Sequence, residues 1–278
     1  MSTQNFIPTI WSENLYRALN KKYIAVANSN REFEGEIKEK GNTVKICGLG
    51  EVNIYTYRKN MDMYSPDSIN SECSELLIDQ AKYFNFQIDD IDLAQAAPRL
   101  MELAMRNAAD AIANDADTYI YGLYSEAGKT ISAQVSAESI IDSLIEARTE
   151  LAKNNVSDPS EIVFEVSPEI AALILKAKVN LATDNTEALE NGCIGSIAGC
   201  KIFVSNNIYT VQGSGGVIEH KCLARTKRAV AFAEQLSEID AYRPEHRFAD
   251  AVKGLHLYGA KVVYPAEMVL LNLTVAQA

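Results

Sequence analysis

The sequence has few of the residues from which most enzyme sites are built. Its 278 residues include three histidines, five cysteines and one tryptophan. The histidines, His220, His246 and His256, stand apart in the sequence, whereas a zinc site needs three or four ligands in one place. There is no GxSxG nucleophile elbow. We therefore expect no catalytic residue, no cofactor site and no metal site, and hence a protein that is not an enzyme.

The nearest approach to a nucleotide-binding motif is the tripeptide that begins at Gly128 and continues with Lys129 and Thr130. Five residues separate Gly122 from Gly128, whereas a phosphate-binding P-loop has four between its glycines. A strand should also precede the motif, and the pattern here predicts a helix. A loop after the end of a helix is the simpler interpretation.

The cysteine usage and the lack of long apolar runs point to a cytosolic protein. The chain has five cysteines, an odd number, and contains no CxxC motif. The first residues lack the basic and apolar regions of a signal peptide, and no run of 18 apolar residues is present. Cys193 and Cys200 are close enough to meet across a hairpin, but a reducing compartment keeps such thiols free. We expect free buried thiols and no membrane contact.

Positive charge is also scarce. The chain has 26 Lys and Arg against 37 Asp and Glu, which gives a net charge of −11 and a pI of about 4.9. A protein that grips nucleic acid needs basic residues to neutralise phosphates. This negative net charge argues against a protein that binds nucleic acid tightly, although it allows a surface that faces nucleic acid through weak, non-specific contact.

The dominant feature that is present is one long amphipathic helix, predicted from residue 92 to about residue 121 or 124. Its apolar stripe has helical spacing and comprises Leu93, Ala97, Leu100, Ala104, Ala108, Ala111, Ile112, Tyr119 and Leu123. Its predicted polar face comprises Gln95, Arg99, Glu102, Arg106, Asp110, Asn114 and Asp117. Such a helix is roughly 45–50 Å long, whereas a compact globule of this size has a radius of gyration of roughly 19 Å. This favours a flat plate along a spine, which suits a part of a larger assembly.

A second feature is an arm between residues 42 and 80 that contains few large aliphatic residues. Residues 43–49 and 51–57 alternate as strands do, residues 59–70 form a polar turn, and residues 82–88 predict a returning strand. An isolated hairpin is marginally stable in water. The arm must therefore lie on something else.

The remaining elements mix strands and helices. Residues 23–27 and 161–166 predict strands, residues 136–153 and 167–179 predict helices, and residues 194–205 predict two strands around a turn at Gly199. Residues 253–273 predict two short strands broken by Gly259 and Pro265. Because no strict βαβ alternation is present, the fold class is α+β.

The order of these parts resembles the major capsid (coat) proteins of tailed bacteriophages, specifically the Podovirus-type coat family of the Hong Kong phage capsid fold. The segments that carry the resemblance are FIPTIWSENLYRAL, NREFEGEIKEKGNTVKICGLGEVNIYTY, the helix from Asp92, VFEVSPEIAALIL with NGCIGSIAGCKIFVSNNI, and AYRPEHRFADAVKGLHLYGAKVVYPAEMV. The resemblance implies an N-terminal arm and lead-in (1–41), an extended β-hairpin loop (42–81), a peripheral domain with the spine helix (82–135 and about 240–278) and an axial domain (136–239).

The same resemblance implies a shell subunit. It predicts hexamers and pentamers of one chain that close into an icosahedral virion shell around double-stranded DNA, assembled in the bacterial host cytoplasm with a portal protein. Many relatives begin with a built-in scaffold, which is lacking here, so we expect a separate scaffolding protein. The residues expected at subunit interfaces are Trp11, Val52, Ile54, Tyr55 and Tyr57. Two alternatives stay open: an encapsulin-type compartment, which shares the fold, and a soluble cytosolic α+β enzyme with dispersed site residues.

Overall fold

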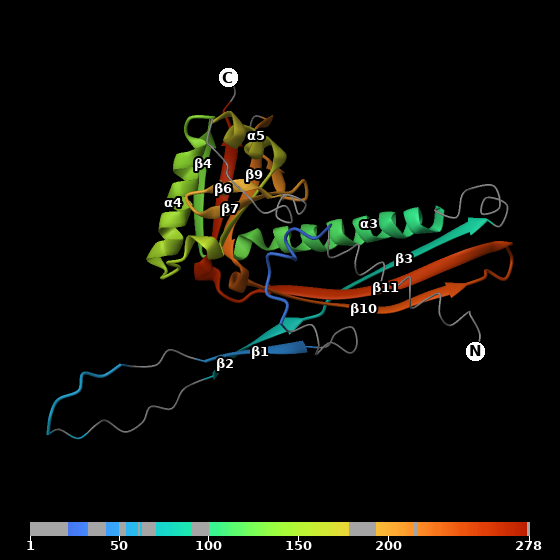
Figure 1. Ribbon diagram of the computed structural model, residues 1–278, viewed down its shortest axis with the longest axis horizontal. Coiled ribbons are helices and arrows are strands. Elements are labelled where there is room, and N and C mark those ends of the chain that lie inside the picture. Colours follow the sequence, from blue (N-terminus) through green and yellow to red (C-terminus); the bar gives the residue numbers. More distant parts are fainter. Residues whose placement is uncertain are drawn as a thin grey trace.

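The computed structural model describes residues 22–32, 43–49, 54–60, 62, 71–89, 100–177, 193–213 and 216–276. These residues form a block, an elongated platform that extends from its base, and a thin arm that projects to the opposite side (Figure 1). A seven-stranded sheet occupies the block, a three-stranded sheet occupies the platform, and a two-stranded sheet begins the arm. The mixture of helices and sheets confirms the predicted α+β class.

The block is built on the seven-stranded sheet. Its strands, in spatial order, are β4 (Lys129–Val135), β12 (Met268–Val275), β9 (Ile218–Thr226), β5 (Ile162–Val166), β7 (Cys200–Val204) and β6 (Cys193–Ile197), with β8 (Thr210–Gln212) paired to β9. Two helices cover it, α4 (Ile140–Lys153) and α5 (Pro168–Lys176). Short 3-10 turns connect the elements: η3 (Leu123–Glu126), η4 (Pro159–Glu161), η6 (Lys227–Ala229) and η7 (Pro265–Glu267). Strand β5 is buried along its whole length, as its mostly apolar sequence predicts, and the buried residues include the charged Glu165.

Local sequence signals set the ends of several elements in the block. Helix α5 begins at Pro168, and the Ser167 hydroxyl accepts a bond from Ile170 N at 3.5 Å, which is a standard N-cap arrangement. The predicted turn between β6 and β7 is present, with Ala198 at φ +52° and Gly199 at φ +84°. Glycine suits the second position because it adopts positive φ without steric cost.

The platform consists of the three-stranded sheet and the spine helix. The sheet has the order β10 (Val230–Tyr242), β11 (Ala249–Val262) and β3 (Gln80–Asp89), all antiparallel. Helix α3 (Leu100–Gly122) runs along it (Figure 1). Strand β11 continues through Gly259, so the predicted break there is wrong. A Cβ at Gly259 would lie 2.3 Å from Leu77 O, so the glycine allows close approach of the neighbouring backbone instead of ending the strand.

Helix α3 ends near the predicted position, but its buried face is rotated from the predicted stripe. The predicted start at residue 92 lies outside the described residues. The buried side chains are Met105, Ala109, Ile112, Ala113, Ala116, Asp117, Ile120 and Tyr121. Ala111, predicted to face inward, is exposed, and Asp117, predicted on the polar face, is 1% exposed. The prediction placed Asp117 on the outer face because the residue is polar, but its carboxylate binds backbone N–H groups inside the protein.

The arm begins as the antiparallel pair β1 (Thr43–Leu49) and β2 (Ser71–Leu77). The inner face of this pair packs on the platform sheet in a small core of Val44, Ile46, Leu76, Ile78, Ala231, Ala233 and Leu257. Residues 54–60 contain no strand, so β2 is the partner of β1, and the strand predicted over residues 51–57 is absent from the part of it that is described. Strand β3 pairs with β11 of the platform and does not return along the arm.

Candidate assembly surfaces and their internal support

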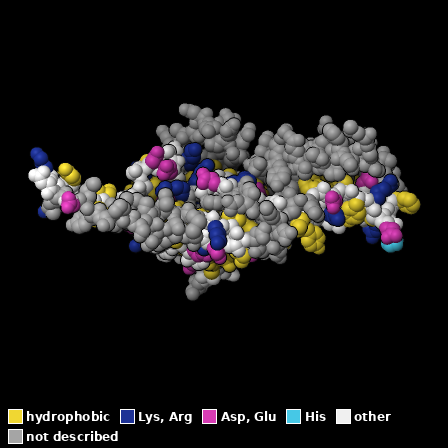
Figure 2. Space-filling view, turned by 90° about the horizontal axis from the view of Figure 1, so that it is seen from below, with side chains coloured by type: hydrophobic (Ala, Val, Ile, Leu, Met, Phe, Trp, Pro, Cys, Tyr) yellow, Lys and Arg dark blue, Asp and Glu magenta, His cyan; other side chains and the backbone are white. Residues whose placement is uncertain are grey.

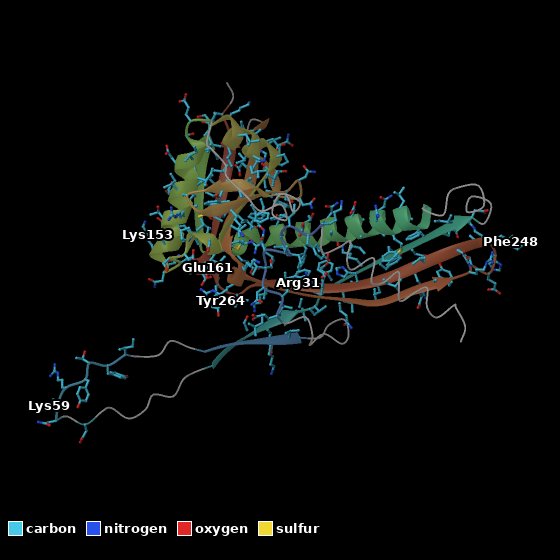
Figure 3. All side chains as sticks on the ribbon, viewed as in Figure 1. Arg31, Lys59, Lys153, Glu161, Phe248 and Tyr264 are labelled. Carbon is cyan, nitrogen blue, oxygen red and sulfur yellow. The ribbon has the colours of Figure 1, made fainter. Side chains whose placement is uncertain are left out.

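The far part of the arm exposes large apolar side chains. Ile54 is 96% exposed, Tyr57 76% and Tyr55 52%. Lys59 marks the far end of this segment in Figure 3, and Figure 2 shows yellow hydrophobic side chains on the thin arm. Single exposed apolar residues are ordinary, but three within four positions on a projecting segment are typical of a contact surface. The other two predicted interface residues, Trp11 and Val52, lie outside the described residues.

A second exposed apolar position, Phe248, lies at the opposite end of the molecule, and the sequence alone did not suggest it. Phe248, at the turn between β10 and β11, is 84% exposed, and Tyr83 on β3 is 81% exposed. Figure 3 shows Phe248 at the far tip of the platform. Tyr83 sits where alternation along β3 places it on the face away from α3, because Phe84 and Phe86 pack against the main core. Both ends of the elongated molecule therefore present apolar groups to solvent.

Between these ends, residues 22–32 form a connector that joins the block to the platform. Residues 23–27 were predicted as a strand, but they form turns, with Asn28 N bonded to Ile24 O at 3.2 Å. The Asp117 carboxylate of α3 accepts Ile24 N at 3.0 Å and Val26 N at 3.1 Å. Turns expose unpaired backbone groups, and a buried carboxylate satisfies two of them here.

An ion pair with no solvent exposure holds the same connector from the side of the block. Arg225 on β9 donates to both carboxylate oxygens of Glu165 on β5, each at 2.9 Å, and both side chains are 0% exposed. Its remaining donors reach Asn28 O at 2.7 Å and Ala25 O at 2.9 Å. Buried charges are stable only when they are paired and fully hydrogen-bonded, and this arrangement meets both conditions.

The platform holds the connector through Glu234 on β10. Its Oε2 accepts the Tyr23 hydroxyl at 2.5 Å and lies 2.9 Å from His256 Nε2, while its Oε1 accepts Arg31 Nη2 at 2.6 Å. Figure 3 places Arg31 at the centre of the molecule, between block and platform. The backbone contributes as well, because Asn30 N donates to Val230 O and Phe232 N donates to Asn30 O. The connector is thus bonded to α3, to both large sheets and across their junction.

Burial changes the pKa of two acids at this junction in opposite directions. Burial raises the pKa of Asp117 to about 7, although the bonds from Ile24 N and Val26 N act against the rise. Burial also disfavours ionisation of Glu234. The bonds from His256 and Tyr23 and the charge of Arg31 outweigh that effect and hold the Glu234 pKa below its ordinary value. The two carboxyls therefore give the junction opposite responses to pH.

The candidate chemical groups do not gather into a site. His220 lies in the block, His256 is bonded to Glu234 in the platform, and His246 is exposed in the turn before Phe248. Among the described residues no group of three or more potential metal ligands is found. Lys129 is the first residue of β4, and a Cβ at Gly128 would lie 2.5 Å from Pro265 O. Gly128 therefore allows a close backbone approach to Pro265. Lys129 and Thr130 pair with β12 as part of β4, so the loop predicted for these two residues is wrong. No described helix is long and apolar enough to cross a membrane.

Two thiols, those of Cys200 and Cys222, lie inside the block. Cys200 and Cys222 are free and buried, and burial raises the pKa of both, to about 12 for Cys222. Across the β6–β7 hairpin, Cys193 stands opposite Phe203 and Cys200 opposite Ile197. The pair suggested by the sequence therefore does not share a register position.

Comparison with known proteins identifies the fold. No family model matches the sequence, and no curated protein does. A solved chain from Mycobacterium phage Che8 is 30% identical, with a TM-score of 0.68 and coverage of 90% of this chain and 91% of that one. The capsid of Ralstonia phage GP4 matches at 12% identity, TM-score 0.68 and coverages of 90% and 87%. The mature capsid of bacteriophage PhiM1 matches at 16% identity, TM-score 0.64 and coverages of 91% and 87%.

These matches each cover about nine-tenths of the chain. The predicted capsid fold is therefore confirmed. The structures matched in phages GP4 and PhiM1 are capsids. The chain is a shell-forming structural protein and not an enzyme, and it belongs to the family of tailed-bacteriophage major capsid proteins.

Proposed function

We propose that the chain assembles into hexamers and pentamers that close as an icosahedral shell around the double-stranded DNA of a tailed phage or prophage. The observation that carries this proposal is the projecting arm, whose Ile54 and Tyr57 are almost fully exposed in the single subunit. Burial of one large apolar side chain contributes about 1.5–3 kcal/mol. Because every subunit has an arm, this contribution is repeated at each contact of a closed shell.

The contact surface we propose consists of Ile54, Tyr55 and Tyr57, extended by Val52 and Trp11 on the sequence argument. The base of the arm is already packed on its own platform through Val44 and Ile46, so it sets the direction of the arm. The outer part then lies on a neighbouring subunit. Phe248 at the tip of the platform forms a second contact with another neighbour.

We further propose that the block is the axial domain and the platform the peripheral domain. Sheet membership supports boundaries that differ in detail from those suggested by the sequence. Strands β4 and β12 belong to the sheet of the block, so 129–135 and 268–275 go with the axial domain. Strand β10 begins at Val230 in the platform sheet, so 230–239 goes with the peripheral domain.

The remaining partners follow from charge and from the sequence resemblance. A net charge of −11 favours weak, non-specific contact with packaged DNA, because tight neutralisation of phosphates needs clustered basic residues. A separate scaffolding protein and a portal protein complete the proposed assembly in the host cytoplasm. The Podovirus-type assignment within the tailed phages is part of the proposal and rests on the sequence resemblance.

An encapsulin-type compartment is the second candidate. The crystal structure of a virus-like particle from Pyrococcus furiosus matches at 12% identity and a TM-score of 0.60, with coverage of 96% of this chain and 99% of that one. The two candidates differ in contents, because a compartment holds protein cargo and a phage shell holds DNA. Analysis of particles isolated from the native host distinguishes them.

Electron microscopy and light scattering of the purified full chain test the proposal. We expect capsomers or closed particles for the wild type. Ile54→Asp with Tyr57→Asp should leave a folded subunit that does not assemble, because charged groups would have to be buried at the contact. Lys59→Ala, on the same exposed segment, is the matched control and should assemble. A wild-type chain that stays monomeric at high concentration would contradict shell formation, and assembly of the double variant would contradict the role of the arm.

A further inference from the structure

Two cysteines occupy directly opposite positions at the base of the arm. In the antiparallel pair of β1 and β2, which lie side by side in Figure 1, the Cα partner of Cys47 is Cys73. The register is continuous from Thr43 opposite Leu77 to Leu49 opposite Ser71, without a bulge. The pairing is therefore set by seven consecutive residue pairs and not by the two cysteines alone.

Alternation along the two strands assigns these two positions to one row. Val44 and Ile46 of β1 and Leu76 of β2 are buried against the platform. Lys45 and its partner Glu75 occupy the other row and are exposed. Because alternate residues share a face of a strand, positions 47 and 73 continue the row of Lys45 and Glu75.

The backbone geometry of such a pair suits a disulfide. Opposite residues of antiparallel strands have Cα atoms about 4.5 or 5.5 Å apart, and disulfides span Cα distances of about 4.4–6.8 Å. The other cysteines do not offer this arrangement, because Cys200 stands opposite Ile197 and Cys222 is fully buried on β9. The register therefore offers an opposed pair of cysteines at the base of the arm.

We propose that Cys47 and Cys73 form a redox modification site that a small-molecule disulfide, such as oxidised glutathione, converts to an intrachain disulfide. The thiolate of one cysteine attacks a sulfur of oxidised glutathione and releases one glutathione thiolate. The second cysteine then attacks the protein sulfur of this mixed disulfide and releases the other glutathione. The two protein thiols lose two electrons and two protons, and one oxidised glutathione becomes two reduced molecules.

The site closes the segment 48–72, which includes the exposed Ile54 and Tyr57, into a loop at its base. A cross-link of this kind removes conformations from the unfolded chain. The stage at which the disulfide forms rests on the proposed function, because a shell assembled in a reducing cytosol meets oxidising conditions only when it leaves the cell. The chemistry itself requires only the folded subunit.

The test uses the full chain in a glutathione redox buffer, followed by alkylation of free thiols and trypsin digestion without reduction. Trypsin releases residues 46–58, which contain Cys47, and residues 60–82, which contain Cys73. We expect these two peptides to be recovered linked to each other, and the link to be lost on reduction. Cys47→Ser and Cys73→Ser should each abolish the linked peptide and leave a glutathione adduct on the remaining cysteine.

Register variants provide a matched control that also separates this inference from shell formation. With both native cysteines replaced by Ser, Lys45→Cys with Glu75→Cys should link, because these positions are partners. The diagonal combination of Lys45→Cys with Cys73, in a Cys47→Ser chain, should give mainly glutathione adducts. Wild-type recovery of Cys47 and Cys73 on separate peptides, or equal linking of the diagonal pair, would overturn the proposal. Neither outcome depends on whether the chain assembles.

Discussion

The connector and the arm distribute polarity in opposite ways. The connector, residues 22–32, is held inside the molecule by Asp117, Glu165, Arg225 and Glu234, all of which are buried. The far arm, residues 54–60, instead exposes Ile54, Tyr55 and Tyr57. The buried charges that hold the connector are paired within the same chain, whereas we propose that the exposed apolar groups of the arm contact another chain.

This contrast separates what folds the subunit from what assembles it. Buried polar groups lose much of their stabilising effect if one partner is removed, so the connector should control subunit stability. Exposed apolar groups make few contacts in the single chain, so the arm should control association. The predictions below test this division in order of decreasing effect on the stability of the single subunit.

The largest loss of stability is expected when the buried ion pair is broken. Arg225→Met leaves Glu165 as an unpaired buried charge and removes the donors to Asn28 O and Ala25 O. Removing one partner of a buried pair costs about 3–5 kcal/mol. Urea unfolding of the unassembled subunit measures this cost. Arg225→Met combined with Glu165→Gln is the control and should recover part of the loss, because no charge then stays buried. Equal instability of both variants would show that the backbone contacts, and not the charge, dominate.

A smaller loss is expected when the cap on the connector turn is removed. Asp117→Ala leaves Ile24 N and Val26 N without acceptors in a buried position. Unsatisfied buried donors cost about 1–3 kcal/mol. Asp110→Ala is the matched control on the same helix, because Asp110 is half-exposed in an ion pair with Lys22 and should change the stability by less than about 0.5 kcal/mol. Equal unfolding midpoints for the two variants would contradict a role for the connector.

The pH dependence of the unfolding free energy should show the effect of the Asp117 carboxyl. Burial raises the pKa of Asp117 from an ordinary value of 3.8 to about 7, so the folded chain binds more protons than the unfolded chain between these values. Its contribution to stability is therefore present at low pH and lost as the pH rises toward 7. Glu234 acts with the opposite sign, because its lowered pKa gives a contribution that is lost as the pH falls.

Asp117→Asn isolates the first of these two effects. The difference in unfolding free energy, wild type minus variant, should decrease between about pH 4 and pH 7 and stay constant above. Unfolding curves of both subunits across this range give the difference directly. A difference that rises with pH would mean that the bonds from the connector, and not burial, dominate the pKa of Asp117.

The smallest effect on the single subunit is expected on the far arm. Ile54→Ala should change the unfolding free energy by less than about 0.5 kcal/mol, because the side chain is 96% exposed. Ile46→Ala, at the packed base of the same arm, is the matched control and should cost about 2–5 kcal/mol. A similar loss of unfolding free energy in the two variants would contradict the view that the base of the arm stabilises the subunit and its far part does not.

Several parts of this fold could be predicted from the sequence because their causes are local. The end of the spine helix, the buried strand β5 and the cap of α5 at Ser167 and Pro168 each follow from spacing or from one adjacent residue. Of the predicted interface residues, Ile54, Tyr55 and Tyr57 are exposed, and their role in assembly stays a prediction. Phe248 was missed because an isolated aromatic residue in a charged turn gives no periodic signal.

The sequence could not show which distant residues and strands of the chain pair with each other. Helical spacing finds an amphipathic helix, but Asp117 turns inward only because the connector brings two N–H groups to it. Strand alternation predicts the faces of β1 and β3, but not that β1 pairs with β2 while β3 pairs with β11. The same holds for Cys47 and Cys73, whose opposition is a consequence of register.

The sequence by itself thus determined the α+β class, the spine helix, an arm too poor in aliphatic residues for a core of its own, and the lack of a motif for chemistry. These features follow from composition and periodicity, which act over a few residues. The tertiary structure alone decided the rotation of the spine, the burial of Arg225 with Glu165, and the joint that residues 22–32 make between two sheets. These features join residues far apart in the chain. They form because each buried donor and charge must find a partner, and only the folded arrangement supplies one.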